Sequence, residues 1–184
     1  SIMKNPSYFY ATALICNNGH LLCSNLERHP EQKNRFCPHC SAPAISQCPH
    51  CSAPIHGDLI RKSSTEVLTS FETPFISDTP SYTCVKHCHV PAYCPNCGQP
   101  FPWTETLLTQ ADRIIDLVDD LTEEQKCQLK QCFPNLITDT PESQYSALLA
   151  DKLMRCMNQL AIDALKNLLI NYISAPLLVL LRWK

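Results

Sequence analysis

The sequence predicts a small, metal-stabilised α+β protein, with an N-terminal double zinc ribbon on short β-hairpins and a C-terminal α-helical part. Three observations lead to this fold class. The chain of 184 residues holds 13 cysteines, and ten of them precede residue 98. Three Cys-Pro-x-Cys turns recur in that half, and long apolar periodicity at helical spacing begins only after it. We therefore divide the chain into a double zinc-ribbon domain, residues 1–102, and a helical domain with an apolar C-terminal tail, residues 103–184.

Composition excludes several classes of protein. Apolar residues make up 45% of the chain, which is enough for a hydrophobic core. With only 3 glycines, the chain contains neither GxGxxG nor GxxxxGK[ST], which argues against Rossmann and P-loop nucleotide enzymes. The formal net charge is −2, so no overall basic excess attracts the chain to nucleic acid.

The cysteines are expected to bind metal rather than form disulfides. An odd number of thiols cannot all pair within one chain. The first ten residues show no long apolar segment typical of a signal peptide, so we expect a cytoplasmic protein with reduced thiols.

One short motif repeats three times. Cys37-Pro-His-Cys-Ser-Ala-Pro recurs at Cys48, and a looser copy, Cys-Pro-Asn-Cys-Gly-Gln-Pro, begins at Cys94. Two residues between the thiolates let both sulfurs point at one ion, and a tetrahedral zinc ion needs two such pairs. The natural four-thiolate site is formed by Cys48, Cys51, Cys94 and Cys97.

Cys37 and Cys40 then need a second pair of ligands. The best candidate is the segment Cys16-Asn-Asn-Gly-His20, because Gly19 allows a tight turn that brings the imidazole to the same ion. The sequence thus predicts a site with three cysteines and one histidine: Cys16, His20, Cys37 and Cys40.

Other ligand arrangements stay open. A single site from the first two Cys-Pro-His-Cys turns would leave the third turn without a clear partner. A further group could supply that partner or hold a third ion: Cys84, His87, Cys88 and His89. For three thiols a ligand role and a buried free thiol are equally compatible with the sequence: Cys23, Cys84 and Cys88.

The remaining cysteines and histidines are assigned non-ligand roles. Cys127, Cys132 and Cys156 lie at helical positions and are expected to be small core residues. His39 and His50 are expected to face solvent. Both proposed sites are fully ligated, and the sequence has neither HExxH nor a Ser/His/Asp arrangement, so we expect no enzymatic activity.

The rest of the chain is divided by its turn and capping signals. Residues 61–83 predict a hairpin or excursion loop, with a strand-like piece at 65–71. Thr104 is expected to cap a first helix that extends to about Val118, and Thr122-Glu-Glu-Gln125 resembles a capping box for a second helix that ends near Phe133-Pro134.

Thr140-Pro141 is expected to begin a long third helix that extends to about Ile173. One face of it joins apolar positions from Tyr145 through Leu148 and Leu160 to Tyr172. The apolar segment 168–181, followed by Arg-Trp-Lys, has three interpretations: packing onto its own helices, self-association, or membrane association.

The N-terminal motifs together resemble a known family. The order is Tyr10-Ala-Thr-Ala-Leu-Ile-Cys-Asn-Asn-Gly-His20, Phe36-Cys-Pro-His-Cys40, Cys48-Pro-His-Cys51 with Pro54-Ile-His-Gly57, and Val90-Pro-Ala-Tyr-Cys-Pro-Asn-Cys-Gly-Gln-Pro-Phe-Pro-Trp-Thr104. This order resembles an uncharacterised bacterial zinc-ribbon family that is catalogued as a domain of unknown function. The resemblance covers roughly residues 8–106 and implies a bacterial zinc-binding protein with the eight ligands above. Ser41 departs from the glycine that the family usually has at that position.

The preferred function is a protein-interaction or adaptor module in a bacterial assembly, with a helical self-association half. Its partner is another protein or a second copy of the chain. The alternatives are a nucleic-acid-binding zinc ribbon and an effector associated with membranes through residues 168–184. Six aromatic residues lie near the ribbons, and most of them are expected to fill the small core rather than anchor a partner: Tyr8, Phe9, Tyr10, Tyr93, Phe101 and Trp103.

Overall fold

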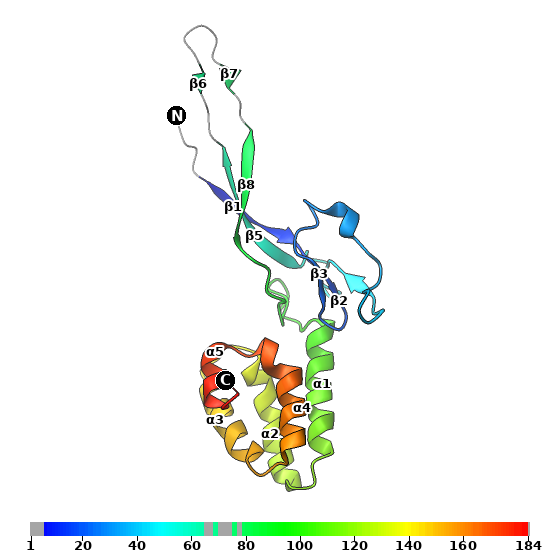
Figure 1. Cartoon of the computed structure of the whole chain (residues 1–184), viewed down its shortest axis with the longest axis vertical. Coiled ribbons are helices and arrows are strands. Elements are labelled where there is room, and N and C mark those ends of the chain that lie inside the picture. The colour runs from blue at the N-terminus through cyan, green and yellow to red at the C-terminus, as the bar shows by residue number, and fades with distance from the viewer. Residues whose placement is uncertain (1–5, 65–67, 70–74, 77–78, 184) are drawn as a thin grey trace. The chain divides into compact units, whose positions relative to one another are not determined.

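The computed structural model of the protein describes residues 6–64, 68–69, 75–76 and 79–183. The chain divides into two compact units, Ser1–Phe101 and Pro102–Lys184, whose elements are shown in Figure 1. Among the described residues, every strand belongs to the first unit and every α-helix to the second. The predicted α+β fold is therefore confirmed.

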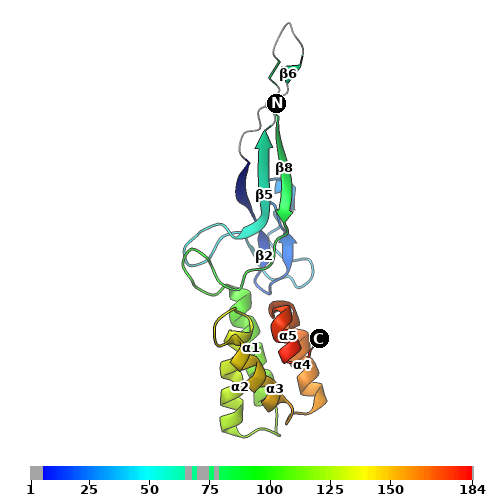
Figure 2. The same cartoon turned by 90° about the vertical axis from the view of Figure 1, so that its left-hand side faces the viewer.

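The larger sheet of the first unit has three antiparallel strands in the order β1 (Ser7–Thr12), β5 (His56–Ser64) and β8 (Pro80–Lys86). Figure 2 shows β5 and β8 side by side along most of their length. In the register of these strands, Tyr8 lies opposite Arg61. Strand β1 forms one edge of this sheet.

Beyond β5 and β8, the short strands β6 (Leu68–Thr69) and β7 (Phe75–Ile76) pair in the same antiparallel sense. The predicted hairpin is thus present in the described residues of 61–83. Most of the expected strand-like piece at 65–71 lies outside the described residues.

The smaller sheet has the order β3 (Leu21–Cys23), β2 (Leu14–Cys16) and β4 (Ala44–Ile45). A 3-10 turn, η1 (Pro30–Gln32), lies between β3 and β4 in the chain. Among the described residues of the first unit, the buried apolar side chains are mostly small aliphatic groups and thiols, with Phe101 as a larger member. The buried residues of this unit include Ala11, Ala13, Leu14, Ile15, Cys16, Cys23, Cys37, Cys48, Ile55, Ile60, Cys94 and Phe101. A core this small is typical of domains that need metal ions for stability.

The described residues of the second unit, 102–183, form five α-helices and one 3-10 turn. In chain order these are α1 (Pro102–Asp116), α2 (Glu123–Leu136), α3 (Ser143–Met154), α4 (Gln159–Leu169), η2 (Ile170–Tyr172) and α5 (Ala175–Leu180). Their buried side chains form one continuous core that includes Ile115, Leu129, Phe133, Leu165 and Leu169. The amphipathic spacing in the sequence therefore gives a bundle with a hydrophobic core of its own.

Two helix boundaries differ from the prediction and one capping motif agrees with it. Helix α1 begins at Pro102 rather than Thr104, because the fixed φ of proline suits the first helical turn. The predicted capping box is confirmed, since the side chains and backbone N–H groups of Thr122 and Gln125 bond reciprocally. Helix α2 continues through Pro134 to Leu136, and both Phe133 and Leu136 are buried in the last turn.

The expected long helix from Thr140 to Ile173 was wrong. Helix α3 ends at Met154 and a new helix, α4, begins at Gln159. The Asn158 side chain caps α4, because it accepts a hydrogen bond from the Ala161 N–H. The expected apolar face was only partly right: Leu153 is buried, but Tyr145, Leu148 and Leu160 are exposed. Residues outside the expected face also belong to the core, among them Ala147, Ala150, Met154, Leu165 and Leu169.

The apolar tail packs into the core of its own unit. Leu177, Leu178, Leu181 and Trp183 are all buried there, and Trp183 is only 6% exposed. Of the three interpretations of the tail, the structure shows internal packing. Self-association of the helical part stays a prediction. Within the described part of the chain, none of the helices has the length and apolar character that crossing a membrane requires.

For two of the three cysteines assigned to the helical core, the predicted burial was wrong. Cys132 is buried, but Cys127 and Cys156 are exposed. Cys127 lies in α2 five residues before Cys132 and therefore points away from the core face. Cys156 falls in the break between α3 and α4, where the helical periodicity used for the prediction does not apply.

Candidate metal centres

The three Cys-Pro-x-Cys turns have the same backbone geometry. In each, the N–H of the first cysteine bonds to the carbonyl five residues later, as in Cys37 to Ala42 at 2.9 Å. The residue after the second cysteine has a positive φ in every copy: 57° at Ser41, 63° at Ser52 and 75° at Gly98. Ser41 therefore adopts the left-handed conformation that glycine would favour, and the turn is retained despite the substitution.

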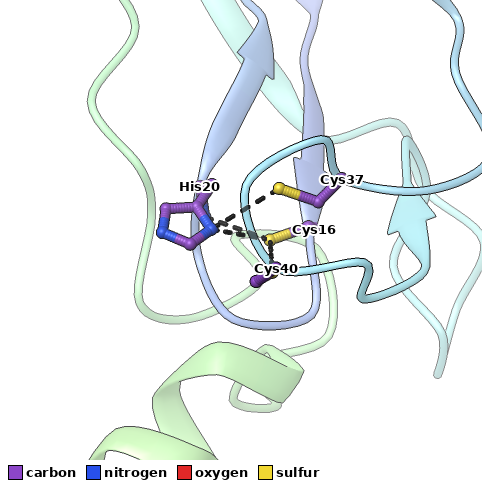
Figure 3. Close-up of side chains that lie close together, drawn as sticks. All are labelled: Cys16, His20, Cys37 and Cys40. Carbon is purple, nitrogen blue, oxygen red and sulfur yellow. Dashed lines mark hydrogen bonds between the residues drawn. The ribbon is translucent and has the colours of Figure 1, made fainter.

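The first cluster consists of Cys16, His20, Cys37 and Cys40, the four residues grouped from the sequence. Cys16 comes from the end of β2, and Gly19, at a φ of 89°, allows the turn that places His20. Figure 3 shows the Nδ1 atom of His20 directed at the sulfurs. This nitrogen lies 3.4 Å from the Sγ of Cys16 and 3.6 Å from that of Cys37.

The second cluster joins the second and third turns, as the sequence spacing predicts. Its members are Cys48, Cys51, Cys94 and Cys97. Cys48 and Cys97 have their sulfurs 3.7 Å apart, and the same separation joins the sulfurs of Cys51 and Cys94. The alternative single site from the first two turns is not formed, because their cysteines belong to different clusters.

These separations match a tetrahedral zinc ion. Zinc–sulfur bonds of about 2.3 Å place two thiolates of a regular tetrahedron about 3.75 Å apart, and a zinc-bound imidazole nitrogen about 3.55 Å from each sulfur. The sulfur pairs at 3.7–3.8 Å and the nitrogen–sulfur pairs at 3.4–3.6 Å agree with both values. They are far longer than a disulfide bond of about 2.05 Å. Each cluster could therefore hold one metal ion.

Two asparagines that the sequence analysis did not single out contact the thiols. Asn18 donates a hydrogen bond from Nδ2 to the Sγ of Cys40, and Asn96 does the same for Cys51, both at 3.3 Å. Their place inside the metal-binding turns was the only available signal. Such outer contacts orient ligands and favour the charged thiolate.

The hydrogen bonds around the thiols change their acidity. The backbone N–H of Ala42 and the amide of Asn18 lower the pKa of Cys40 to about 6. The amide of Asn96 and the backbone N–H of Ala53 lower the pKa of Cys51 to about 6. Since the thiolate is the form that binds metal, both turns present a pre-ionised ligand near neutral pH.

His39 and His50 lie inside the turns and are exposed, as expected. A third group brings together Asp58, Cys84 and His87. It differs from the expected set because Cys88 donates its S–H to the His56 carbonyl, and the Nδ1 of His89 lies beside the Val90 carbonyl. Asp58 was not considered from the sequence.

The aromatic residues near the ribbons are only partly buried. Phe101 and Trp103 are buried and Tyr93 is half-buried. The expectation that most of these residues fill the core was wrong: the exposed fractions of the β1 side chains Tyr8, Phe9 and Tyr10 are 57%, 39% and 49%. Strand β1 has this exposure because it belongs to a sheet edge rather than to the small core.

The chain matches one known family. A family model described as "Uncharacterized protein conserved in bacteria (DUF2321)" matches residues 9–178. The chain belongs to this bacterial family, and the match extends through most of the helical unit, beyond the resemblance drawn from the N-terminal motifs. Searches of curated proteins and of solved structures gave no match.

Proposed function

We propose that this protein is a zinc-ribbon recognition module, without enzymatic activity, that binds an extended acidic segment of a partner protein along β1. Two zinc ions, one in each four-residue cluster, stabilise the first unit. Zinc is the metal that suits thiolate and imidazole ligands at tetrahedral spacing. Since each ion would have four protein ligands, these two sites serve structure and leave no position for a substrate.

The N-terminal part of the edge strand β1 carries the proposal. At the other end of the strand, the Thr12 backbone already bonds to the Glu27 carboxylate and to the Leu26 N–H. Strand β1, with the sequence Ser-Tyr-Phe-Tyr-Ala-Thr, contains neither a charged residue nor a proline. Natural sheets normally protect an edge with such residues, because its free backbone groups can pair with another chain. An aromatic edge strand supports recognition by strand addition, in which main-chain bonds give affinity and side-chain pockets give specificity.

The charges beside β1 favour an acidic partner. Arg61 and Lys62 on β5 and Lys86 on β8 are all exposed. Arg61 lies opposite Tyr8, and the Lys62 ammonium lies 6.0 Å from the centre of the Tyr82 ring. The acidic residue of these strands, Asp58, is buried, and the exposed Glu27 carboxylate beside the end of β1 is bonded to Thr12. A partner segment with aspartate or glutamate side chains would complement this surface.

The test is site-specific photo-crosslinking of the full chain in its bacterial host. A photoreactive phenylalanine analogue replaces Tyr8 in one variant and Tyr145 of α3 in another, because both tyrosines are exposed. We expect a discrete protein adduct from position 8 and none from position 145. The adduct should be lost when Tyr10 is changed to Lys. Equal adducts from both positions, or none from position 8, would overturn the proposal.

The second candidate partner is single-stranded nucleic acid. The rings of Tyr10 and His56 are stacked at 4.2 Å with an interplanar angle of 5°. Exposed rings beside cations also form stacking platforms for bases. Fluorescence anisotropy with a labelled single-stranded oligonucleotide separates the two candidates. Micromolar binding that is lost in Tyr10→Ala would favour nucleic acid, and retained weak binding in that variant would exclude this surface.

A further inference from the structure

A third group of metal-binding side chains lies in the larger sheet, next to a cavity. We propose that Asp58, Cys84 and His87 form a third metal site, and that its fourth coordination position is open to a small anionic ligand in the cavity. The site is independent of the two clusters above, and it uses none of their residues.

The ligand atoms converge on one point. The Nδ1 of His87 lies 3.6 Å from the Sγ of Cys84 and 4.0 Å from the Oδ1 of Asp58. The first distance matches the nitrogen–sulfur separation of about 3.55 Å around a tetrahedral zinc ion. The second is longer than the roughly 3.4 Å for zinc-bound nitrogen and oxygen. The His87 side chain is 92% exposed, and a small rotation would bring its ring onto the ion.

The same convergence argues against a nucleophilic cysteine with a histidine base. In such an arrangement the thiol contacts one ring nitrogen and the carboxylate orients the ring through the other. Here the thiol and the carboxylate both approach Nδ1. Shared approach to one nitrogen is the geometry of ligands around a common ion.

The fold holds the carboxylate in place before any ion binds. Asp58 is only 8% exposed and accepts hydrogen bonds from the Ser24 hydroxyl at 2.9 Å and from the Cys88 N–H at 2.7 Å. A carboxylate has about four acceptor positions, so two remain for a metal. Cys84 is placed on the neighbouring strand by pairing with Ile60.

The cavity beside this site defines the ligand. Its volume is about 700 Å³, and Asp58 and Cys84 both line it. Three protein ligands with one open position are typical of zinc sites that bind an exchangeable group. One thiolate and one carboxylate neutralise a divalent ion, so the open position accepts either water or an anion.

The remaining walls carry apolar, cationic and acidic side chains, and the acidic one, Glu27, has its carboxylate bonded to the N–H and the hydroxyl of Thr12. Phe9, Ile60 and Tyr82 line the cavity together with Arg28. Among the described residues, no carboxylate forms an ion pair with Arg28, so its guanidinium remains available to a ligand. A small molecule with a carboxylate or phosphate group and an apolar body fits this arrangement.

The first experiment counts metal in the full chain after reconstitution with Zn²⁺ and gel filtration. We expect three ions in the wild type and two in Cys84→Ser, with the fold checked by circular dichroism. Cys88→Ser is the matched control, because its S–H bonds to a carbonyl, and it should keep three ions. Two ions in the wild type, or three in Cys84→Ser, would overturn the third site.

The second experiment tests the open position with Co²⁺ as the probe. Cobalt is added to the two-zinc protein, and its visible spectrum is followed during titration with acetate and with inorganic phosphate. We expect at least one anion to change the spectrum, with roughly tenfold weaker affinity in Arg28→Gln, as for loss of a charged hydrogen bond. A spectrum that neither anion changes, or equal affinity in the variant, would refute the anion site. Phe9 of β1 lines the cavity, but neither experiment measures binding of a partner segment along β1, so their failure would not affect the partner proposal.

Discussion

The side-chain amide of Asn96 donates a hydrogen bond to the sulfur of Cys51, 3.3 Å away, and thereby links the third Cys-Pro-x-Cys turn to the second. The two residues are 45 positions apart in sequence. The bond crosses the second cluster, which Cys94 and Cys97 on one side and Cys48 and Cys51 on the other form, and which could hold a metal ion. It stabilises the thiolate form of Cys51, whose pKa is lowered to about 6.

Replacement of Asn96 is predicted to weaken metal binding at the second centre. Loss of such an outer contact typically reduces metal affinity by about 10- to 100-fold. We expect this reduction for Asn96→Ala in a competition titration with a zinc-binding dye. His50 occupies the matching position of the second turn and is exposed, so His50→Ala is the control. Equal affinities in the two variants would refute a role for the amide.

Exchange of the residues at the left-handed turn positions should change stability in opposite directions. In the left-handed conformation, a residue other than glycine destabilises the folded state by about 1–2 kcal/mol. Glycine avoids this penalty, but its greater freedom in the unfolded chain reduces the gain by about 0.4–1 kcal/mol. We therefore expect Ser52→Gly to stabilise the first unit and Gly98→Ser to destabilise it, each by roughly 0.5–1 kcal/mol. Denaturant midpoints of the zinc-loaded chain provide the measurement. Shifts of the same sign would contradict the common turn geometry.

The buried tail predicts a large effect for the penultimate residue. Trp183 lies in the helical core at 6% exposure, whereas Val179 of α5 is 62% exposed. Trp183→Ala should lower the free energy of unfolding by about 3–5 kcal/mol, and Val179→Ala should change it by less than about 0.5 kcal/mol. Urea unfolding followed by helical circular dichroism measures both. A neutral Trp183→Ala would mean that the tail does not pack on its own unit.

The cysteines of the helical unit should differ in reactivity. Cys132 is buried, and this burial raises its pKa to about 11, so little thiolate is present at pH 8. Cys127 and Cys156 are exposed. Treatment of the zinc-loaded chain with iodoacetamide, followed by peptide mass spectrometry, should label the two exposed thiols at least tenfold faster than Cys132. Rapid labelling of Cys132 would show that the core opens on the timescale of the reaction.

The sequence was most informative where chemistry depends on local spacing. Two residues between thiols, a repeated turn and a tight glycine at position 19 were enough to group the eight side chains of the two clusters. Asn18, Asn96 and Asp58 were not found, because their roles depend on contacts between segments far apart in the chain. No spacing rule connects Asp58 with Cys84, which meet only through the pairing of β5 and β8.

The helical part was predicted less well for a different reason. Leu148 and Leu160 are apolar, and apolar periodicity alone assigned them to the core, although both are exposed. A single capping asparagine, Asn158, starts a new helix, so Leu160 and the residues after it do not continue the apolar face of α3. Local hydrogen bonding outweighed the average pattern at this point. The exposure of Tyr8 and Tyr10 was missed similarly, because a sequence does not show which strand forms an edge.

The central claim is that the chain holds two separate structural zinc ions, and zinc counting in Cys40→Ser, Cys51→Ser and the double variant tests it most directly. These cysteines belong to different clusters. We predict the loss of one ion in each single variant and of two ions in the double variant, relative to the wild type. Loss of only one ion in the double variant would contradict the account, because it would place both cysteines on the same metal.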